Sequence, residues 1–234
     1  MTYAPNNIKA ILFDMDGTLV DSERQSEQAM LALLTERGRS TDGLDLVQFH
    51  GVAWKQIAAR LLALYPGVGA GVVQLAGDIE AGFQHLFVTT PPDIIPGALE
   101  AFAAAAAAFP GATTIVTGSE ARAVENLLDR TDLHELCTGY TSCDQYQKSK
   151  PDPQSYLVAA DRLGVAPESC LVFEDSRAGL MAARAAGMCC VAITRGVPER
   201  VRQAAELADD AIDDFRDLPD GFFASAAQPG KSSD

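Results

Sequence analysis

The sequence predicts an α/β fold with a doubly wound parallel sheet and one inserted helical segment. The first observation is a set of short apolar runs separated by stretches of helical periodicity; the runs cover residues 10–13, 113–116, 171–173 and 190–193. Strands that alternate with helices favour a parallel sheet covered on both faces. The second observation is a break in this alternation, since apolar residues keep helical spacing from about residue 22 to residue 88.

The first apolar run, at 10–13, is expected to be a buried strand, and the chain leaves it for the helical segment. We expect the core to consist of residues 1–21 and 92–225, with a helical domain at 22–91. Residues 226–234 are expected to form a disordered tail, because they are polar and lie at the end of the chain.

Helix signals follow in the second half of the chain. Asp152 can cap a helix whose first residue is Pro153, because proline suits the first helical position. Ser176 can cap the next helix, which we expect to end at Gly187. Both helices follow the order that a doubly wound sheet requires.

Composition excludes several classes of protein. The 234 residues are 47% hydrophobic and 21% charged, which is ordinary for a globular chain. The net charge of −14 argues against nucleic acid and anionic membranes as partners. The sequence shows neither an apolar stretch of membrane-spanning length nor a signal sequence, so we expect a cytoplasmic protein. The five cysteines lack metal-ligand spacing and are expected to be reduced thiols.

Two carboxylates mark the end of the first expected strand. Asp14 and Asp16 follow the run at 10–13 directly. Like charges raise each other's pKa, and buried ions are costly unless a cation meets them. Ligand chemistry in such sheets lies at the carboxyl ends of strands, so this position indicates a site. The alternative is that both residues only cap a turn, since Asp-Gly is common turn material.

Other polar residues stand in matching positions along the chain. Thr117 follows the second run, Lys150 precedes a Pro-Asp-Pro segment, and Glu174-Asp175 follow the third run. Lys150 alone could equally be a solvated loop lysine like its neighbour Lys148. The ordered set makes turn capping a poor explanation of all these positions.

This ordered set resembles the haloacid dehalogenase superfamily, in its phosphatase branch with the β-phosphoglucomutase-like arrangement. The resemblance spans about residues 8 to 218 and includes four motifs: Asp14 to Thr18, Thr117, Lys150 and Glu174-Asp175. It implies a helical cap in the place of the inserted segment. It also implies a phosphomonoester hydrolase acting on a small phosphorylated sugar, sugar acid or polyol.

The resemblance assigns roles to the motif residues. Asp14 would be the nucleophile that forms an aspartyl-phosphate, and Asp16 the general acid and base. Thr117 and the Gly118 amide would hold phosphate oxygens, and Lys150 would neutralise charge on the phosphoryl group and on Asp14. Ser119 and Arg122 could face the substrate or lie in solvent.

A metal ion is expected in the same place. Mg²⁺ suits an oxygen-only ligand set better than Zn²⁺ does. By resemblance, the ligands would be Asp14, the backbone carbonyl of Asp16 and Asp175, with Glu174 acting directly or through water.

Two other functions remain as alternatives: a sugar-phosphate mutase and a non-catalytic binding protein. A sugar-phosphate mutase of this family has a histidine and a cap arginine where this chain has Ser26 and Trp54. A non-catalytic binding protein would usually have lost a motif carboxylate, and none is lost here. His50, Trp54 and Lys55 could contact substrate, but a lone His or Trp in a helical segment more often serves packing.

Overall fold

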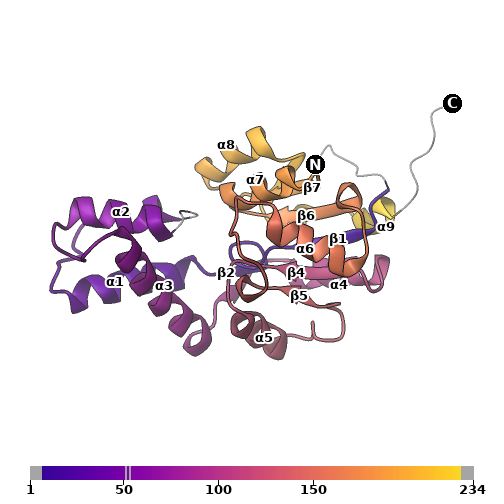
Figure 1. The fold of residues 1–234 in the computed structure, drawn as a ribbon. Coiled ribbons are helices and arrows are strands. Elements are labelled where there is room, and N and C mark those ends of the chain that lie inside the picture. The colour runs from indigo at the N-terminus through magenta and orange to yellow at the C-terminus, as the bar shows by residue number, and fades with distance from the viewer. Residues whose placement is uncertain (1–6, 51, 53, 228–234) are drawn as a thin grey trace. The chain divides into compact units, whose positions relative to one another are not determined.

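The computed structural model describes residues 7–50, 52 and 54–227. The chain divides into two compact units, one made of residues 1–20 and 94–234, the other of residues 21–93. Figure 1 shows both units.

The larger unit is built on a parallel sheet of six strands, which confirms the expected fold class. The strand order is β5-β4-β1-β6-β7-β8, and neighbouring strands run parallel. Their bounds are β1 Ala10–Phe13, β4 Thr113–Val116, β5 Tyr140–Thr141, β6 Cys170–Glu174, β7 Cys189–Ile193 and β8 Asp210–Ile212. Helices lie on both sides of the sheet (Figure 1).

Alternate residues of the central strands face opposite sides of the sheet, as strand geometry requires. On one side Leu12 and Val172 pack against three helices: α6 (Gln154–Leu163), α7 (Arg177–Ala185) and α8 (Pro198–Leu207). This side is rich in alanine, so the helices can lie close to the strands. It carries Tyr156, a fully buried aromatic residue of α6.

The other side of the sheet carries an aromatic cluster. Phe13 and Phe173 are partners in the β1–β6 register, and their rings stack with centroids 5.1 Å apart. Phe102 of α4 (Ala98–Ala108) packs on Phe13, and Phe223 of α9 (Phe222–Ala226) packs on Phe173. Each such aromatic pair adds roughly 0.5–1.5 kcal/mol beyond the burial of its area. The cluster therefore fixes the two strands side by side just before their carboxyl ends.

Strand β1 lies at the point where the strand order reverses. The chain passes from β1 to β4 and β5 on one side, then crosses to β6, β7 and β8 on the other. Such switch points leave a crevice at the carboxyl ends of the strands, where ligands bind in open α/β sheets. Asp14 is the first residue after β1, so it stands at this point.

The smaller unit consists of helices in its described residues. They are α1 (Glu23–Glu36), a 3₁₀ turn at Val47–Phe49, α2 (Trp54–Leu64) and α3 (Val72–Thr89). Met30, Leu34, Ile57, Leu61 and Ile79 are buried between them, at the helical spacing that the sequence shows. Two short strands, β2 (Val20–Asp21) and β3 (Asp93–Ile94), pair where the chain leaves and re-enters the larger unit.

The remaining elements belong to the larger unit. They are α5 (Ala121–Arg130) and the 3₁₀ turns Cys143–Gln145, Pro167–Ser169 and Phe215–Asp217. Ser176 caps α7 as expected, since its hydroxyl accepts a hydrogen bond from the amide of Gly179. The helix at 154 begins one residue later than expected: Pro153 is its cap, while the Asp152 carboxylate accepts from the amide of Gln154 at 3.0 Å.

The boundary expected for a disordered tail, at 226, is wrong by at least two residues. Ala226 ends α9 and is 1% exposed, because the helix buries Phe222, Phe223 and Ala226 against the sheet. Residues 228–234, the rest of that expected tail, lie outside the described residues. Strands β5 and β8 were also not predicted from apolar runs in the sequence, since both are short and contain polar residues.

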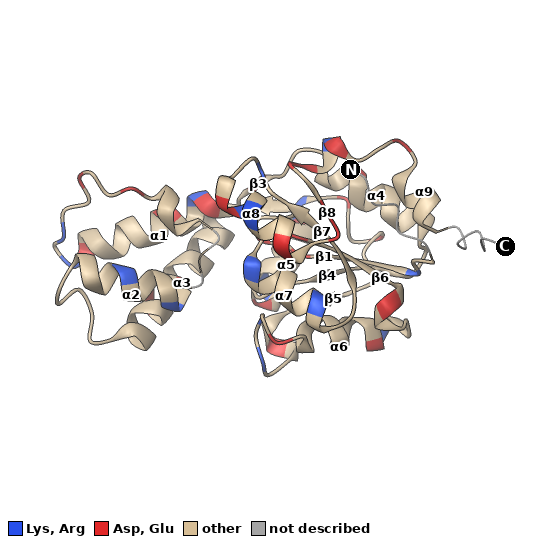
Figure 2. Cartoon of the chain, turned by 90° about the horizontal axis from the view of Figure 1, so that it is seen from above, with Lys and Arg blue, Asp and Glu red and all other residues tan. Residues whose placement is uncertain are grey.

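Two expectations from composition, on membrane-spanning segments and on the cysteines, can be compared with the structure. Among the residues that the structure describes, no helix is both long and apolar enough to cross a bilayer. The five cysteines are free thiols. Acidic residues are spread over the elements of both units, as Figure 2 shows.

Candidate active site

Lys150 and Asp14 form a buried ion pair at the carboxyl end of β1. The Lys150 ammonium donates to Oδ1 of Asp14 at 2.6 Å and to Oε1 of Glu174 at 2.7 Å. It also lies 4.8 Å from the centre of the Tyr156 ring. The Lys150 side chain is 10% exposed, whereas that of Lys148 is 72% exposed. The interpretation of Lys150 as a solvated loop lysine is therefore wrong.

Glu174 is held by four donors. Its Oε1 accepts from Lys150 and from the Tyr156 hydroxyl at 3.2 Å. Its Oε2 accepts from the amide and the hydroxyl of Ser176, at 2.8 and 3.1 Å. A carboxylate offers about four lone-pair sites, so these donors occupy most of its capacity. Glu174 is thereby fixed as the anchor of Lys150.

Asp16 is linked to the segment that follows β4. Its Oδ2 accepts from the hydroxyl of Ser119 at 2.7 Å and from that of Thr117 at 3.2 Å. The Thr117 hydroxyl in turn accepts from the amide of Ser119 at 3.0 Å. Asp14 and Asp16 thus bond to segments more than a hundred residues away, which turn capping does not explain.

Asp175 pairs with a residue that the sequence analysis missed. Nη2 of Arg200 lies 2.8 Å from Oδ2 of Asp175, and the two side chains are 7% and 5% exposed. The signal in the sequence was an arginine on the apolar face of a helix, since Arg200 and Ala204 are the buried residues of α8. Gly17, with φ +84°, leaves the Asp175 carboxylate the space that a Cβ would fill.

Three carboxylates come together in a way that fits a metal ion. Asp14, Glu174 and Asp175 each offer one oxygen, and these oxygens lie within 4.8 Å of one another. The side chain of Asp16 is outside this group, so it would contribute through its backbone carbonyl, as the resemblance implies. Lys150 pairs with Asp14 and Glu174, Arg200 pairs with Asp175, and a divalent cation would add positive charge beside these converging oxygens. The donor set is oxygen-only, which suits Mg²⁺.

The electrostatics of the site follow from burial and proximity. Burial raises the pKa of Asp14 and Lys150 lowers it, while Glu174, Asp175 and Asp16 raise it further, so this pKa lies well above its usual value. Burial alone would lower the pKa of Lys150, but the charges of Asp14 and Glu174 outweigh it and leave this pKa well above its usual value. Lys150 is therefore a permanent cation in this position.

The other candidate site residues of the larger unit follow β4; they are Thr117, Gly118, Ser119 and Arg122. Thr117 is fully buried, and its carbonyl accepts from the Tyr146 hydroxyl at 2.9 Å. Gly118 is exposed beside it, with open space where a side chain would stand. Arg122 is exposed, and Ser119 is buried against Asp16. Of the residues named after Thr117, Ser119 is thus the one that joins the carboxylates.

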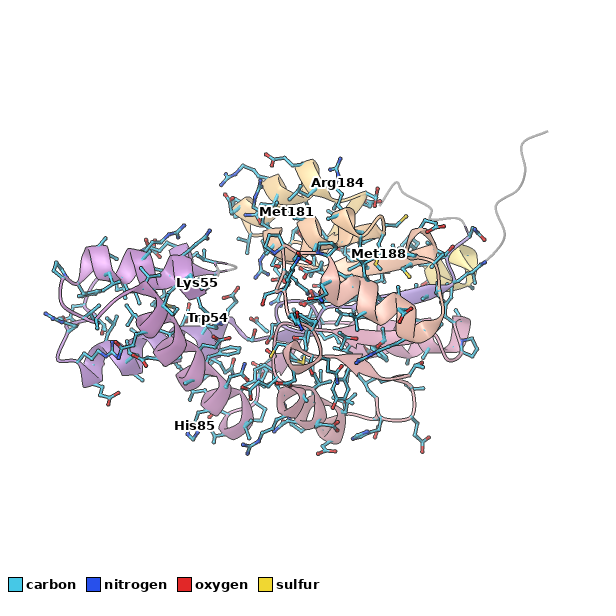
Figure 3. All side chains as sticks on the ribbon, in the orientation of Figure 1. Trp54, Lys55, His85, Met181, Arg184 and Met188 are labelled. Atoms are coloured by element: carbon cyan, nitrogen blue, oxygen red, sulfur yellow. The ribbon has the colours of Figure 1, made fainter. Side chains whose placement is uncertain are left out.

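The candidate residues of the helical unit differ in their exposure and contacts. Trp54, at the start of α2, packs its ring against Phe83 of α3 with centroids 5.2 Å apart. His50 pairs with Glu27 at 2.7 Å. Lys55 and His85 are exposed, on α2 and α3, where Figure 3 labels them. Gly51, between His50 and Trp54, lies outside the described residues.

Comparison with known families agrees with this geometry. The family model of haloacid dehalogenase-like hydrolases matches residues 8–187, which include Asp14, Thr117, Lys150 and Asp175. Arg200 lies beyond the matched range.

Curated relatives of similar length are named as phosphatases. The validoxylamine A 7'-phosphate phosphatase of Streptomyces hygroscopicus subsp. limoneus is 30% identical over 186 residues, covering 80% of this chain and 85% of the relative. Phosphoglycolate phosphatase 1 of Pseudomonas aeruginosa is 30% identical over 216 residues, covering 90% and 78%.

Solved structures share the fold. A CbbY protein of Rhodobacter sphaeroides, in complex with xylulose-(1,5)bisphosphate, superposes with a TM-score of 0.71 at 27% identity, covering 90% of this chain and 96% of that one. A putative β-phosphoglucomutase of Thermotoga maritima gives a TM-score of 0.66 at 25% identity, covering 88% and 94%. With the motif residues gathered at the end of β1 and the family model matching most of the chain, this protein belongs to the haloacid dehalogenase-like hydrolases.

Proposed function

We propose that this hydrolase cleaves a small phosphorylated metabolite, a sugar, sugar-acid or polyol phosphate, in a Mg²⁺-dependent reaction through an aspartyl-phosphate. The observation that carries the proposal is the buried ion pair between Lys150 and Asp14 beside two further carboxylates. The relatives named as phosphatases support the class of reaction, and the bisphosphate complex of the CbbY protein supports a sugar-like substrate.

Asp14 is the proposed nucleophile. A carboxylate oxygen of Asp14 attacks phosphorus, the bond between phosphorus and the leaving oxygen breaks, and the phosphoryl group is left on Asp14. An anion attacking an anion requires charge neutralisation, which Lys150 supplies from 2.6 Å. Lys150 stays in place during the reaction because Glu174 holds it from the other side.

Asp16 is the proposed acid and base. It donates a proton to the leaving alcohol, then accepts one from the water that attacks phosphorus and frees Asp14. The bonds from Ser119 and Thr117 orient its carboxylate. The Thr117 hydroxyl must turn away from Asp16 to bind a phosphate oxygen, whereas the exposed Gly118 amide needs no such change.

Asp14, Asp175 and the backbone carbonyl of Asp16 are the proposed direct ligands of Mg²⁺. The ion would neutralise charge on the transferring phosphoryl group. Glu174 is proposed to act through water, because its oxygens already accept four hydrogen bonds. Removal of the metal by EDTA should abolish activity, added Mg²⁺ should restore it, and Ca²⁺ should inhibit because its coordination shell is larger.

A mutase remains the rival reaction, since one structural neighbour is named a putative β-phosphoglucomutase. It would need groups that keep water from the aspartyl-phosphate until a sugar hydroxyl arrives. Ser26 is a buried serine of α1, and the indole of Trp54 packs on Phe83, so neither supplies the charged group that the mutase uses at its position. Water is therefore the proposed acceptor.

The deciding experiment has two parts. A screen of phosphorylated metabolites and p-nitrophenyl phosphate measures phosphate release with and without Mg²⁺; no release from any compound would favour a non-catalytic binding protein. Incubation with β-glucose 1-phosphate and a trace of its bisphosphate then separates the two enzymes. Glucose 6-phosphate forming faster than free phosphate would show a mutase.

A further inference from the structure

Arg200 is a buried cation that the proposed reaction leaves without a role. It projects from α8, outside the segment that the family model matches, and its side chain is 7% exposed. Burial of a charged side chain is costly unless it is paired. It pairs with Asp175, one of the three carboxylates whose oxygens converge.

The segment before α8 fixes where Arg200 begins. After β7, the amide of Thr194 donates to the carbonyl of Ile212 at 2.8 Å, and the amide of Gly196 donates to the Asp213 carboxylate at 3.0 Å. Pro198 then starts the helix with the φ that a first turn needs. Arg200 thus lies in the first turn of α8, and the segment before this helix is hydrogen-bonded to the end of β8.

The Asp175 carboxylate is confined from two sides. The Arg200 guanidinium holds its Oδ2 at 2.8 Å. The backbone of Gly17 lies so close to the carboxylate that a Cβ added to Gly17 would overlap it. Charge-assisted bonds of this kind restrict the orientation of a carboxylate more than neutral ones do.

We propose that Arg200 is a positioning residue for the metal site, which holds the Asp175 carboxylate in the orientation that binds a divalent cation. The inference rests on the proposed function, because it takes Asp175 as a metal ligand. Residues that hydrogen-bond to metal ligands commonly change metal affinity by roughly 10–100-fold when they are replaced.

Arg200 also carries a positive charge that repels a metal ion. Whether its replacement weakens or strengthens Mg²⁺ binding therefore distinguishes positioning from repulsion. Its charge is largely offset by Asp175 itself, whereas a rotated Asp175 loses a direct oxygen–metal contact. Positioning therefore outweighs repulsion, and replacement of Arg200 weakens the binding of Mg²⁺.

The test measures binding of Mg²⁺ to the full chain without substrate, by isothermal titration calorimetry and by the Mg²⁺-induced shift in melting temperature. Arg200→Gln should raise the Kd for Mg²⁺ about tenfold or more. Arg200→Lys should lie between this variant and the wild type. Arg202→Gln is the matched control, since Arg202 is exposed on the same helix and pairs with Glu199, and its Kd should be unchanged.

A merely structural role would lower the melting temperature of Arg200→Gln equally with and without Mg²⁺, with a Kd within about twofold of the wild type, and this result would overturn the proposal. A lower Kd would overturn it as well, in favour of repulsion. If Arg200→Gln does not fold, Arg200→Lys decides: its Kd should rise about threefold or more, and a wild-type Kd counts against positioning.

The binding data also separate this inference from the proposed function. If the wild type hydrolyses substrate and binds Mg²⁺ but Arg200→Gln binds it equally well, the inference alone fails. If the wild type shows no Mg²⁺ binding at all, the proposed metal site fails and the role of Arg200 fails with it.

Discussion

The ammonium group of Lys150 lies 2.6 Å from Oδ1 of Asp14, across 136 positions of sequence. The same nitrogen bonds to Glu174, so one buried cation serves two buried carboxylates. This arrangement is informative because removal of the shared cation leaves two buried carboxylates charged and unsatisfied, whereas removal of the Asp14 charge leaves Lys150 paired with Glu174.

Lys150→Met should abolish activity and destabilise the protein by roughly 3–5 kcal/mol, since the carboxylates of Asp14 and Glu174 lose their shared cation. Urea unfolding at neutral pH and phosphate release measure the two effects. Lys148→Met is the control, because the Lys148 side chain is 72% exposed. Equal effects of the two substitutions would contradict the structural assignment of Lys150.

Asp14→Asn should remove turnover while the metal-free protein becomes as stable as the wild type or more so. The reason is the raised pKa of Asp14, which burial and the carboxylates Glu174, Asp175 and Asp16 produce against the effect of Lys150: the ionised form is disfavoured in the folded state. The neutral amide avoids that cost.

Melting temperatures in EDTA and turnover in Mg²⁺ test this pair of effects. Asp129→Asn is the control, since Asp129 is 72% exposed and should change stability by about 0.5 kcal/mol or less. Turnover near the wild-type rate in Asp14→Asn would disprove covalent catalysis by this residue.

Gly179→Ala should destabilise the protein by about 2 kcal/mol or more, although alanine is the better helix former. A Cβ at this position of α7 would overlap the carboxylate of Glu174 and displace it from Lys150. Gly77→Ala, in α3, should instead stabilise by up to about 1 kcal/mol, because the space around Gly77 is open. Chemical denaturation of both variants checks the predicted opposite signs.

In Tyr146→Phe, the free energy of unfolding should fall less steeply with rising pH than in the wild type. Burial comes first among the causes that raise the pKa of Tyr146 from 10.0 to about 12. A raised pKa in the folded state means that the stabilisation is complete below about pH 10 and is lost as pH rises through about 12.

The free energy of unfolding measured between pH 9 and pH 12 should therefore fall more steeply in the wild type than in Tyr146→Phe. At pH 7 the variant still loses the hydrogen bond to the Thr117 carbonyl, so the comparison is of slopes and not of absolute values. Parallel curves would show that this phenol ionises alike in the folded and unfolded chains.

The sequence was sufficient for the central strands and the residues directly after them. Buried parallel strands read as continuous apolar runs, so β1, β4, β6 and β7 could be placed, and with them Asp14, Thr117 and Asp175. Edge strands are different: Tyr140–Thr141 and Asp210–Ile212 are short and polar, and only their neighbours in the sheet define them.

The partners of the carboxylates could be predicted only in part. Lys150 was found through the order of motifs, since nothing in its local sequence distinguishes it from Lys148. Arg200 and Ser119 meet Asp175 and Asp16 only through tertiary structure, which places the first turn of α8 and the segment after β4 beside them. Helical periodicity marks Arg200 as buried but does not name what it pairs with.

The alignment of Phe13 with Phe173 has a consequence for the order of folding. The stacked rings bring β1 beside β6, and the next residues along each strand are Asp14 and Glu174. Contacts between segments so distant in the chain carry a loop-closure cost that slows folding. The repulsion between Asp14 and Glu174, and its neutralisation by Lys150, therefore arise together when β1 docks beside β6. Refolding should accordingly slow when the aromatic pair that supports this docking is trimmed.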